Sequence, residues 1–253
     1  MYATERQGLL LHRARTDGRL DVSSMAAELA VTPETVRRDL VTLERQGLLR
    51  RVHGGAIPAE RMDVEAEVSA RHGLASAEKD VIAKAALDQV EGVDTLLLDG
   101  GTTTARFAQL LPADREITVV TNSLPIASVL STRANTTVSM IGGRIRSRTL
   151  ATVDAWALHA LDGLTVDVAV VGANGFSAGR GFTTPDPAEA AVKQAMVHAA
   201  RRTVVLADST KHGADALVRF ARTSDVDVLV TDSGLDQRHR RDVAAAGPEV
   251  VIA

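Results

Sequence analysis

One stretch of the chain combines residue types that bind anions. In LLLDGGTTTARFAQLL, an apolar run is followed by Asp99, Gly100 and Gly101, after which Thr102 and Thr103 open a predicted helix. Glycines let the backbone approach an anion, the first amides of a helix are free to donate, and threonine hydroxyls add donors. This chemistry suits a phosphate group. The stretch is neither a GxGxxG nor a Walker sequence, so an ordinary strand-to-helix turn with capping threonines is the alternative.

Further polar groups follow the other apolar runs. If those runs are parallel strands, their carboxyl ends meet at one edge of a sheet, where open α/β sheets bind ligands. Asp99, Glu189, Asp208 and Lys211 are also residue types that could perform acid–base chemistry at a sugar carbon. The candidate ligand-binding residues after these runs are Thr121, Asn122, Gly142, Gly143, Gly172, Asn174, Asp186, Glu189, Asp208 and Lys211.

Two lysines near these groups receive different interpretations. Only four of the 29 basic residues are lysines, and Lys211 stands beside Asp208, which suggests that a compact charge is required there. Glu189 and Lys193 have the i, i+4 order of a helical ion pair worth about 0.2–0.5 kcal/mol, so surface pairing is an alternative to a binding role for them.

Composition narrows the class of protein. The 253 residues contain no cysteine and seven scattered histidines, so we predict no metal site and no cofactor. No apolar run reaches 18 residues and no basic-then-apolar leader is present, which favours a cytoplasmic protein that does not engage the membrane. The hydrophobic content of 45% supports a sizeable core, and the length favours two domains.

The first 57 residues predict a small helical domain. They carry nine arginines against seven acids, whereas the remainder carries 20 bases against 25 acids. Helical spacing of Leu9, Leu10 and Arg13 predicts a first helix over 5–16, and a second begins at 22–24 with Ser23 or Ser24 as its cap.

A third helix is marked by Thr32 as N-cap and Pro33 in its first turn. Its core face is Val36, Leu40 and Leu43, which leaves a cationic outer face. Two helices joined by a tight turn form a helix-turn-helix, whose second helix enters a DNA groove. A β-hairpin wing then follows in LLRRVHGGA. The predicted DNA-binding residues are Thr32, Thr35, Arg37, Arg38, Thr42, Arg50, Arg51 and His53; a solvated surface helix is the alternative.

The rest of the chain predicts an α/β fold. Residues 58–77 are polar and read as a connector, and a helix is expected over 78–89. The domains are therefore 1–57, a linker 58–77, and 78–253. Short runs that are apolar on both faces indicate parallel strands between helices; they are TLLLD, ITVVTNS, TVSMIGG, VDVAVVGANG, TVVLADSTKHG and DVLVTD.

The chain resembles a known family over almost its full length. VTPETVRRDLVTLERQGLLRRVHGGA is similar to the winged helix-turn-helix of DeoR-type bacterial transcription regulators, and DGGTTT, VVTNS, VGANGF, GFTTPDPAEAAVK and LADSTKHG resemble the effector domain of the same family. The resemblance implies a Rossmann-like effector domain similar in fold to ribose-5-phosphate isomerase and glucosamine-6-phosphate deaminase. It also implies a phosphorylated sugar as effector, held by the residues named above.

The resemblance therefore favours a DNA-binding repressor of carbohydrate metabolism genes rather than an enzyme. It implies that a sugar phosphate releases this repressor from its operator or changes its affinity for the operator. Operator symmetry implies a homo-oligomer, either a dimer or a tetramer. A sugar-phosphate isomerase or deaminase with an accessory head and a DNA-binding protein whose body only oligomerises are the alternatives. One departure is Asp154, where family members commonly have glycine, because a carboxylate near an anion site would weaken phosphate binding.

Overall fold

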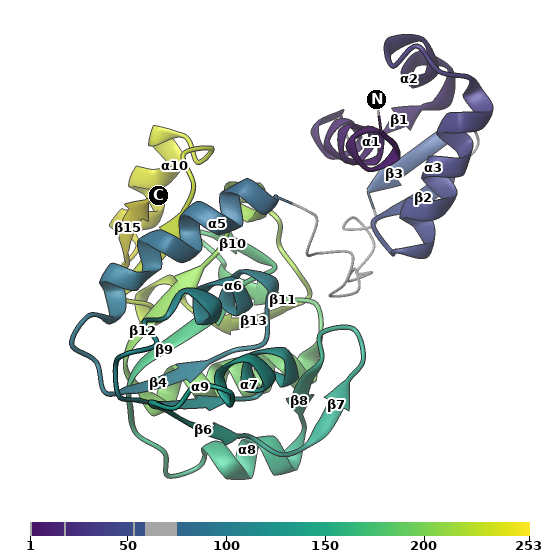
Figure 1. The fold of residues 1–253 in the computed structure, drawn as a ribbon. Coiled ribbons are helices and arrows are strands. Elements are labelled where there is room, and N and C mark those ends of the chain that lie inside the picture. The colour runs from purple at the N-terminus through teal and green to yellow at the C-terminus, as the bar shows by residue number, and fades with distance from the viewer. Residues whose placement is uncertain (1, 18, 53, 59–74) are drawn as a thin grey trace. The chain divides into compact units, whose positions relative to one another are not determined.

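The computed structural model describes residues 2–17, 19–52, 54–58 and 75–253 (Figure 1). The chain divides into two compact units, Met1–Leu74 and Ala75–Ala253. The predicted connector falls mostly on residues 59–74, which lie outside the described residues together with His53. The predicted fold class, a winged helix-turn-helix followed by a larger α/β domain, is confirmed.

In its described residues, the N-terminal unit contains three helices and a small antiparallel sheet of order β1-β3-β2. Its elements are α1 (Ala3–Asp17), β1 (Leu20–Asp21), α2 (Val22–Glu28), α3 (Pro33–Arg45), β2 (Leu49–Val52) and β3 (Gly55–Pro58). The hairpin β2–β3 is the predicted wing, and β1 adds a third strand to it.

The predicted first helix is present as α1, which packs Leu10, Leu11 and Ala14 into the core and leaves Leu9 46% exposed. One detail of the predicted head is wrong. Helix α2 is capped by Asp21 rather than by a serine, because Asp21 ends β1 in an extended conformation and its carboxylate accepts from the amide of Ser24 at 2.9 Å.

The C-terminal unit is built on a seven-stranded parallel sheet of order β15-β14-β12-β9-β4-β5-β6. Its strands are β4 (Thr95–Leu98), β5 (Ile117–Thr121), β6 (Thr136–Met140), β9 (Val166–Gly172), β12 (Ala200–Leu206), β14 (Val228–Thr231) and β15 (Glu249–Ile252). The chain runs outward from β4 to one edge, returns to β9 and then fills the other half. The order therefore reverses between β4 and β9, which is where open α/β sheets form a ligand crevice.

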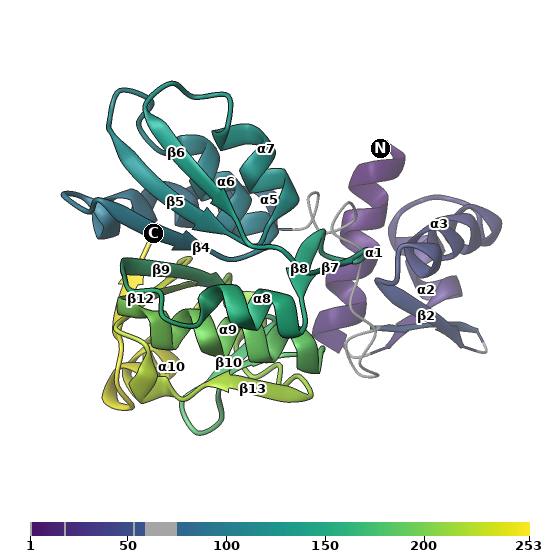
Figure 2. The same cartoon turned by 90° about the horizontal axis from the view of Figure 1, so that it is seen from below.

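Helices cover both faces of this sheet (Figure 2). Helices α5 (Ser76–Ala85), α6 (Thr102–Leu110) and α7 (Leu124–Leu130) pack on one face through Ile82, Phe107 and Ile126. Helices α8 (Ala155–Leu161), α9 (Pro187–Ala199) and α10 (Gln237–Ala245) cover the other, where Met196 and Val243 enter the core. The helix predicted over 78–89 begins two residues earlier and ends as a 3₁₀ turn over Ala86–Val90.

Two small antiparallel sheets and two short 3₁₀ turns escaped the sequence analysis. One sheet is the hairpin of β7 (Arg144–Arg146) and β8 (Ala151–Val153), and the other joins β10 (Gly175–Ser177), β11 (Gly181–Thr184) and β13 (Val218–Ala221). The turns span Ser209–Lys211 and Thr223–Asp225. Within the described ranges, no helix has the length and apolar character that a bilayer crossing requires.

Candidate functional site

Helix α3 presents the exposed face that its sequence predicts. Val36, Leu40 and Leu43 are buried, whereas Arg37 and Arg38 are exposed and Thr35 and Thr42 are half-buried. Thr32 caps the helix, because its hydroxyl accepts from the amide of Thr35 at 3.2 Å. Arg37 makes an exposed ion pair with Glu34 at 3.2 Å, and such pairs contribute little to stability, so its guanidinium can exchange to a phosphate.

Asp39, between these arginines and the core, fixes the orientation of α3. Its buried carboxylate accepts from Arg6 Nε at 2.5 Å and from Gln7 Nε2 at 3.0 Å, both on α1. The hydrogen bond with Asp39 is the main cause that raises the pKa of Arg6 above its usual value. This clamp between α1 and α3 leaves the arginine face directed outward; the sequence analysis did not identify it.

The wing contributes one described cation. Arg51 is exposed, and its Nε and amide nitrogen donate to the two carboxylate oxygens of Glu44 at 2.6 and 2.9 Å. This contact joins the wing to the end of α3. The predicted contacts of the Arg50 side chain and of His53 lie outside what the structure describes.

The point where the sheet order reverses is occupied by a buried ion pair. Asp99 follows β4, Gly172 ends β9, and Lys193 reaches them from α9. Lys193 Nζ donates to Asp99 Oδ2 and, at 2.9 Å, to the carbonyl of Gly172, while the amide of Gly172 donates to Asp99 Oδ2 at 3.0 Å. The ammonium also lies 5.4 Å from the ring centre of Phe220.

This arrangement overturns the surface alternative for two residues of α9. Lys193 and Glu189 are 4% and 5% exposed, so neither belongs to a solvated helix face. Lys193 lies at the centre of the site, although its helical spacing from Glu189 had left it a weaker candidate than the other strand-end residues. Its rarity was a usable signal, since it is one of the four lysines of the chain.

The start of α6 lacks a side-chain cap. Gly101 occupies the N-cap position in an extended conformation and offers no side chain, so among the described residues no side-chain cap hydrogen bond reaches the first amides of this nine-residue helix. Thr102 and Thr103 are buried at this end, and the Thr121 hydroxyl donates to the carbonyl of Leu98 at 2.6 Å.

Neighbouring loops are held tightly against this end. Gly100 donates to Asn122 Oδ1 at 3.0 Å, and Asn122 Nδ2 donates to the carbonyl of Thr152 in β8 at 3.2 Å. A Cβ on Gly100 would lie 2.7 Å from that of Ala151, so glycine is required for this approach. The hairpin β7–β8 therefore contacts the predicted anion-binding stretch, residues 99–103, which is called the anion loop from here on.

A second group of candidates surrounds Arg146 of the hairpin. Arg146 pairs with Asp186 at 3.0 Å and with Glu189 at 3.3 Å, and the hydroxyl of Thr149 donates to Glu189. Asp186 caps α9 by accepting from the amide of Glu189 at 2.9 Å. Both predicted carboxylates are thus engaged by the hairpin.

The remaining strand ends hold Asn174 and the loop after β12. The hydroxyl of Thr184 donates to Asn174 Oδ1 at 3.1 Å, and the buried Asp208 accepts from Thr210. Lys211 is half-buried, and among the described residues no ion pair joins it to Asp208. The ring of His212, the next residue, packs against that of His239 of α10 in a tilted arrangement, with centroids 4.1 Å apart.

Gly142 and Gly143 separate β6 from β7. Gly143 has φ +136°, and a Cβ there would lie 2.6 Å from the carbonyl oxygen of Val153, so this glycine is explained by close packing of the hairpin. Gly142 has open space around its Cβ position.

Asp154 adopts a backbone conformation that favours glycine. Its φ of +77° and ψ of −170° fall in a region that residues with a side chain rarely occupy, which accounts for the usual glycine at this position. Its carboxylate accepts from Arg144 Nε at 2.6 Å, and this hydrogen bond is the main cause that raises the pKa of Arg144. The negative charge of Asp154 is therefore matched locally.

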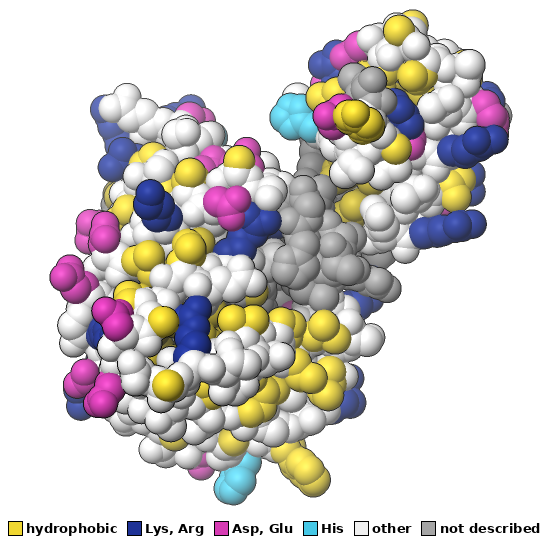
Figure 3. Space-filling model, in the orientation of Figure 1, with side chains coloured by type: hydrophobic (Ala, Val, Ile, Leu, Met, Phe, Trp, Pro, Cys, Tyr) yellow, Lys and Arg dark blue, Asp and Glu magenta, His cyan; other side chains and the backbone are white. Residues whose placement is uncertain are grey.

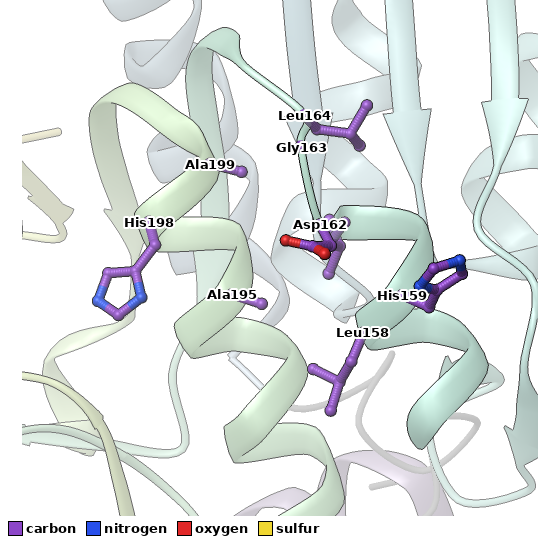
Figure 4. Close-up of a pocket in the computed structure, with 9 residues that line it drawn as sticks. Leu158, His159, Asp162, Gly163, Leu164, Ala195, His198 and Ala199 are labelled. Carbon is purple, nitrogen blue, oxygen red and sulfur yellow. The ribbon is translucent and has the colours of Figure 1, made fainter.

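A separate hollow of about 520 Å³ lies between α8 and α9 (Figure 4). It is lined by Leu158, Leu164, Ala195 and Ala199, with the carboxylate of Asp162 between the helices. These residues precede β9 and β12, so the hollow faces the amino ends of the strands and not the edge where the candidates gather. In the described parts of the chain, no cluster of three or more His, Asp or Glu side chains is suited to a metal ion.

Two family models match the chain in consecutive segments. Residues 6–61 match the DeoR-like helix-turn-helix domain, and residues 74–233 match the DeoR C terminal sensor domain. The chain belongs to the DeoR family. It is therefore a DNA-binding transcription regulator, as the residues of α3 and the wing predict.

Curated relatives of this DeoR-family regulator are similar along nearly the whole chain. The HTH-type transcriptional regulator GlpR of Haloferax volcanii is 35% identical over 93% of this chain and 92% of its own length. The HTH-type transcriptional repressor GlcR of Bacillus subtilis is 31% identical over 92% and 89% of the two chains. The alternative of an enzyme with an accessory head is thus not supported, because these relatives are regulators. A ribose 5-phosphate isomerase A structure from Methanocaldococcus jannaschii covers 55% of this chain and 56% of its own at 18% identity, with a TM-score of 0.40 that is too low to inform function.

Proposed function

We propose that this regulator is a repressor of carbohydrate metabolism genes that releases its operator when a phosphorylated sugar binds at the carboxyl edge of the large sheet. GlcR and the transcriptional repressor AccR of Agrobacterium fabrum, 31% identical over 91% of the chain, support repression as the mode of action. The protein acts in the cytoplasm as a homo-oligomer, a dimer or a tetramer, because one small head makes too few contacts for tight operator binding.

The observation that carries the sugar-phosphate proposal is the uncapped start of α6. Within the described part of the chain, Gly101 leaves the first amides without a side-chain cap, and the positive end of the helix dipole lies there. A phosphate that accepts from these amides would satisfy them, and Thr102 and Thr103 stand in the same turn. The sugar hydroxyls would then face Asn174, Asp208 and Lys211 on the neighbouring strand ends.

Substitution of Gly101 tests this site with two readouts of opposite sign. Gly101→Asp places a carboxylate at the N-cap, where aspartate stabilises a helix, while its charge occupies the position proposed for phosphate. The extended backbone of Gly101 accepts a side chain, with the Thr104 hydroxyl 3.0 Å from the new Cβ as the close neighbour. We expect thermal stability to be kept or raised, and stabilisation by sugar phosphates to be lost.

Gly101→Ser is the matched control, because it caps the helix without a charge. A thermal-shift panel of triose, pentose and hexose phosphates with inorganic phosphate supplies the ligands, and product analysis checks for turnover. A Gly101→Asp protein that still responds to the same sugar phosphate with wild-type affinity contradicts the proposal. So does conversion of a sugar phosphate at an enzyme-like rate.

The DNA-binding residues require a separate test. Arg37→Ala with Arg38→Ala should abolish binding to a duplex selected by the wild-type protein, because each lost base contact costs about 1–3 kcal/mol and each lost phosphate contact lowers the salt dependence. Arg13→Ala is the control, since Arg13 lies on α1 and pairs with Glu28 at 3.1 Å. Undiminished binding by the double variant would remove the proposed recognition face, whatever the sensor domain binds.

A further inference from the structure

Several large apolar side chains are exposed around the hairpin β7–β8. The exposed fractions are 78% for Trp156, 50% for Ile145, 41% for Met140 and 37% for each of Leu124 and Leu150. These five residues are called the hairpin face below. In the space-filling view, hydrophobic side chains collect over the region of α7 and the β7–β8 hairpin (Figure 3).

The members of this face lie close together. The amide of Leu124 donates to the carbonyl of Leu150 at 3.0 Å, and Ile145 pairs with Thr152 inside the hairpin. Thr152 also donates to the carbonyl of Ile141, the residue after Met140, at 2.7 Å, and Trp156 follows β8 in the first turn of α8. The segments that carry these five side chains therefore adjoin one another around the hairpin.

Backbone strain at Leu150 supports a binding role for the hairpin face. Leu150 has φ +56°, a left-handed conformation that glycine or asparagine adopts more easily. A leucine at this position places an apolar side chain at the surface although its backbone disfavours it. Trp156 likewise is the only tryptophan of the chain and stands almost fully in solvent.

We propose that the hairpin face is the contact with a second copy of this chain, related by a two-fold axis. From these exposed fractions, the five side chains present on the order of 500 Å² of apolar surface. A typical interface buries about 800 Å² per partner, of which about 60% is apolar, so the patch supplies the apolar part that a stable dimer needs. Arg144 and Asp154, 62% and 43% exposed, pair at 2.6 Å in the same hairpin region, so these two residues add no net charge beside the patch.

The same hairpin faces the candidate effector site with its other side. Side chains alternate along a strand, so Ile145 points away from Arg146, which holds Asp186 and Glu189. Residues of β8 contact Asn122, which follows β5, and Gly100, which belongs to the anion loop. A ligand that displaces Arg146 or Asn122 would shift the hairpin and with it the contact between copies. This inference rests on the proposed function, because it gives a sugar phosphate a route to the arrangement of the heads.

Trp156 makes the test direct, because it is the sole tryptophan fluorophore. The wild-type chain should associate as its concentration rises, in sedimentation analysis and as a blue shift of tryptophan emission. Ile145→Asp should raise the dissociation constant at least about a hundredfold, since a two-fold axis places two buried charges in one interface. Leu217→Asp is the matched control, because Leu217 is 57% exposed but lies beside β13, outside the hairpin face. That control should associate within about threefold of wild type.

Two results would overturn this contact. One is a wild-type chain that stays monomeric with solvent-exposed tryptophan emission at every concentration; the other is an Ile145→Asp protein that associates as wild type does. Leu150→Ser provides a second variant, and thermal unfolding confirms that each variant is folded. Operator binding measured on the same samples separates the two proposals. Normal association without operator binding contradicts the proposed function alone. Operator binding by an oligomer that Ile145→Asp leaves intact contradicts this interface alone.

Discussion

Replacing Lys193 by methionine should destabilise the sensor domain strongly. Methionine has a similar length but no charge, so the 2%-exposed carboxylate of Asp99 would keep only the amide of Gly172 as a partner among its described contacts. Removing one member of a buried ion pair costs about 3–5 kcal/mol, because the other charge remains uncompensated. We expect a loss of this size in the free energy of unfolding, measured by urea titration of the domain that contains Trp156.

The double variant Asp99→Asn with Lys193→Met separates charge from shape. It leaves no buried charge, and an asparagine oxygen can still accept from Gly172, so most of the loss should be recovered and the coupling energy should exceed about 2 kcal/mol. Arg144→Met is the control, since its pair with Asp154 is exposed and should contribute no measurable stability. If Lys193→Met and Arg144→Met destabilise equally, or if the double variant equals the sum of its single changes, the reasoning about the buried pair is refuted.

The remaining predictions concern strain and pH. Asp154→Gly should raise the free energy of unfolding by about 1 kcal/mol, because glycine adopts this backbone conformation freely. Asp154→Asn should not raise it. Equal effects of the two changes in thermal unfolding would exclude strain as the cause. Burial, followed by the neighbouring His239, lowers the pKa of His212 below its ordinary 6.5 despite the opposing influence of Asp236 and Asp242, so the folded chain resists a proton that the unfolded chain accepts. The contribution of His212 to the free energy of unfolding should therefore be fully present above pH 6.5 and decrease as the pH falls below it. In urea titrations at several pH values, His212→Asn should remove this part of the dependence of stability on pH. An unchanged dependence would contradict the assignment.

Local patterns were sufficient to predict the head and six of the seven strands of the large sheet. The face of α3 follows from Val36, Leu40 and Leu43, whose spacing of three and four residues can be read within a single helix. The six predicted strands are short apolar runs bounded by polar residues, whereas the seventh, β15, was missed. The order of the strands was not predictable, because nothing local specifies which strand lies beside β4.

Features that join distant segments were missed. Lys193 and Asp99 are 94 residues apart and meet only because α9 crosses the sheet beside the reversal point. Arg6 and Asp39 are 33 residues apart and meet through the packing of α1 on α3. The hairpin β7–β8 has strands of only three residues, too short for a periodic pattern, although it connects several candidate residues.

Two of the candidate carboxylates are held by cations of the same domain. Asp99 accepts from Gly172 and Lys193 through Oδ2, and Glu189 accepts from Arg146 and Thr149 through Oε1. A ligand that rearranges these contacts exchanges one set of hydrogen bonds for another, which shifts an equilibrium between conformations without any covalent change. Under the proposed function, a ligand that breaks the contact of Arg146 with Glu189 would move the hairpin β7–β8, and a regulator requires only that response.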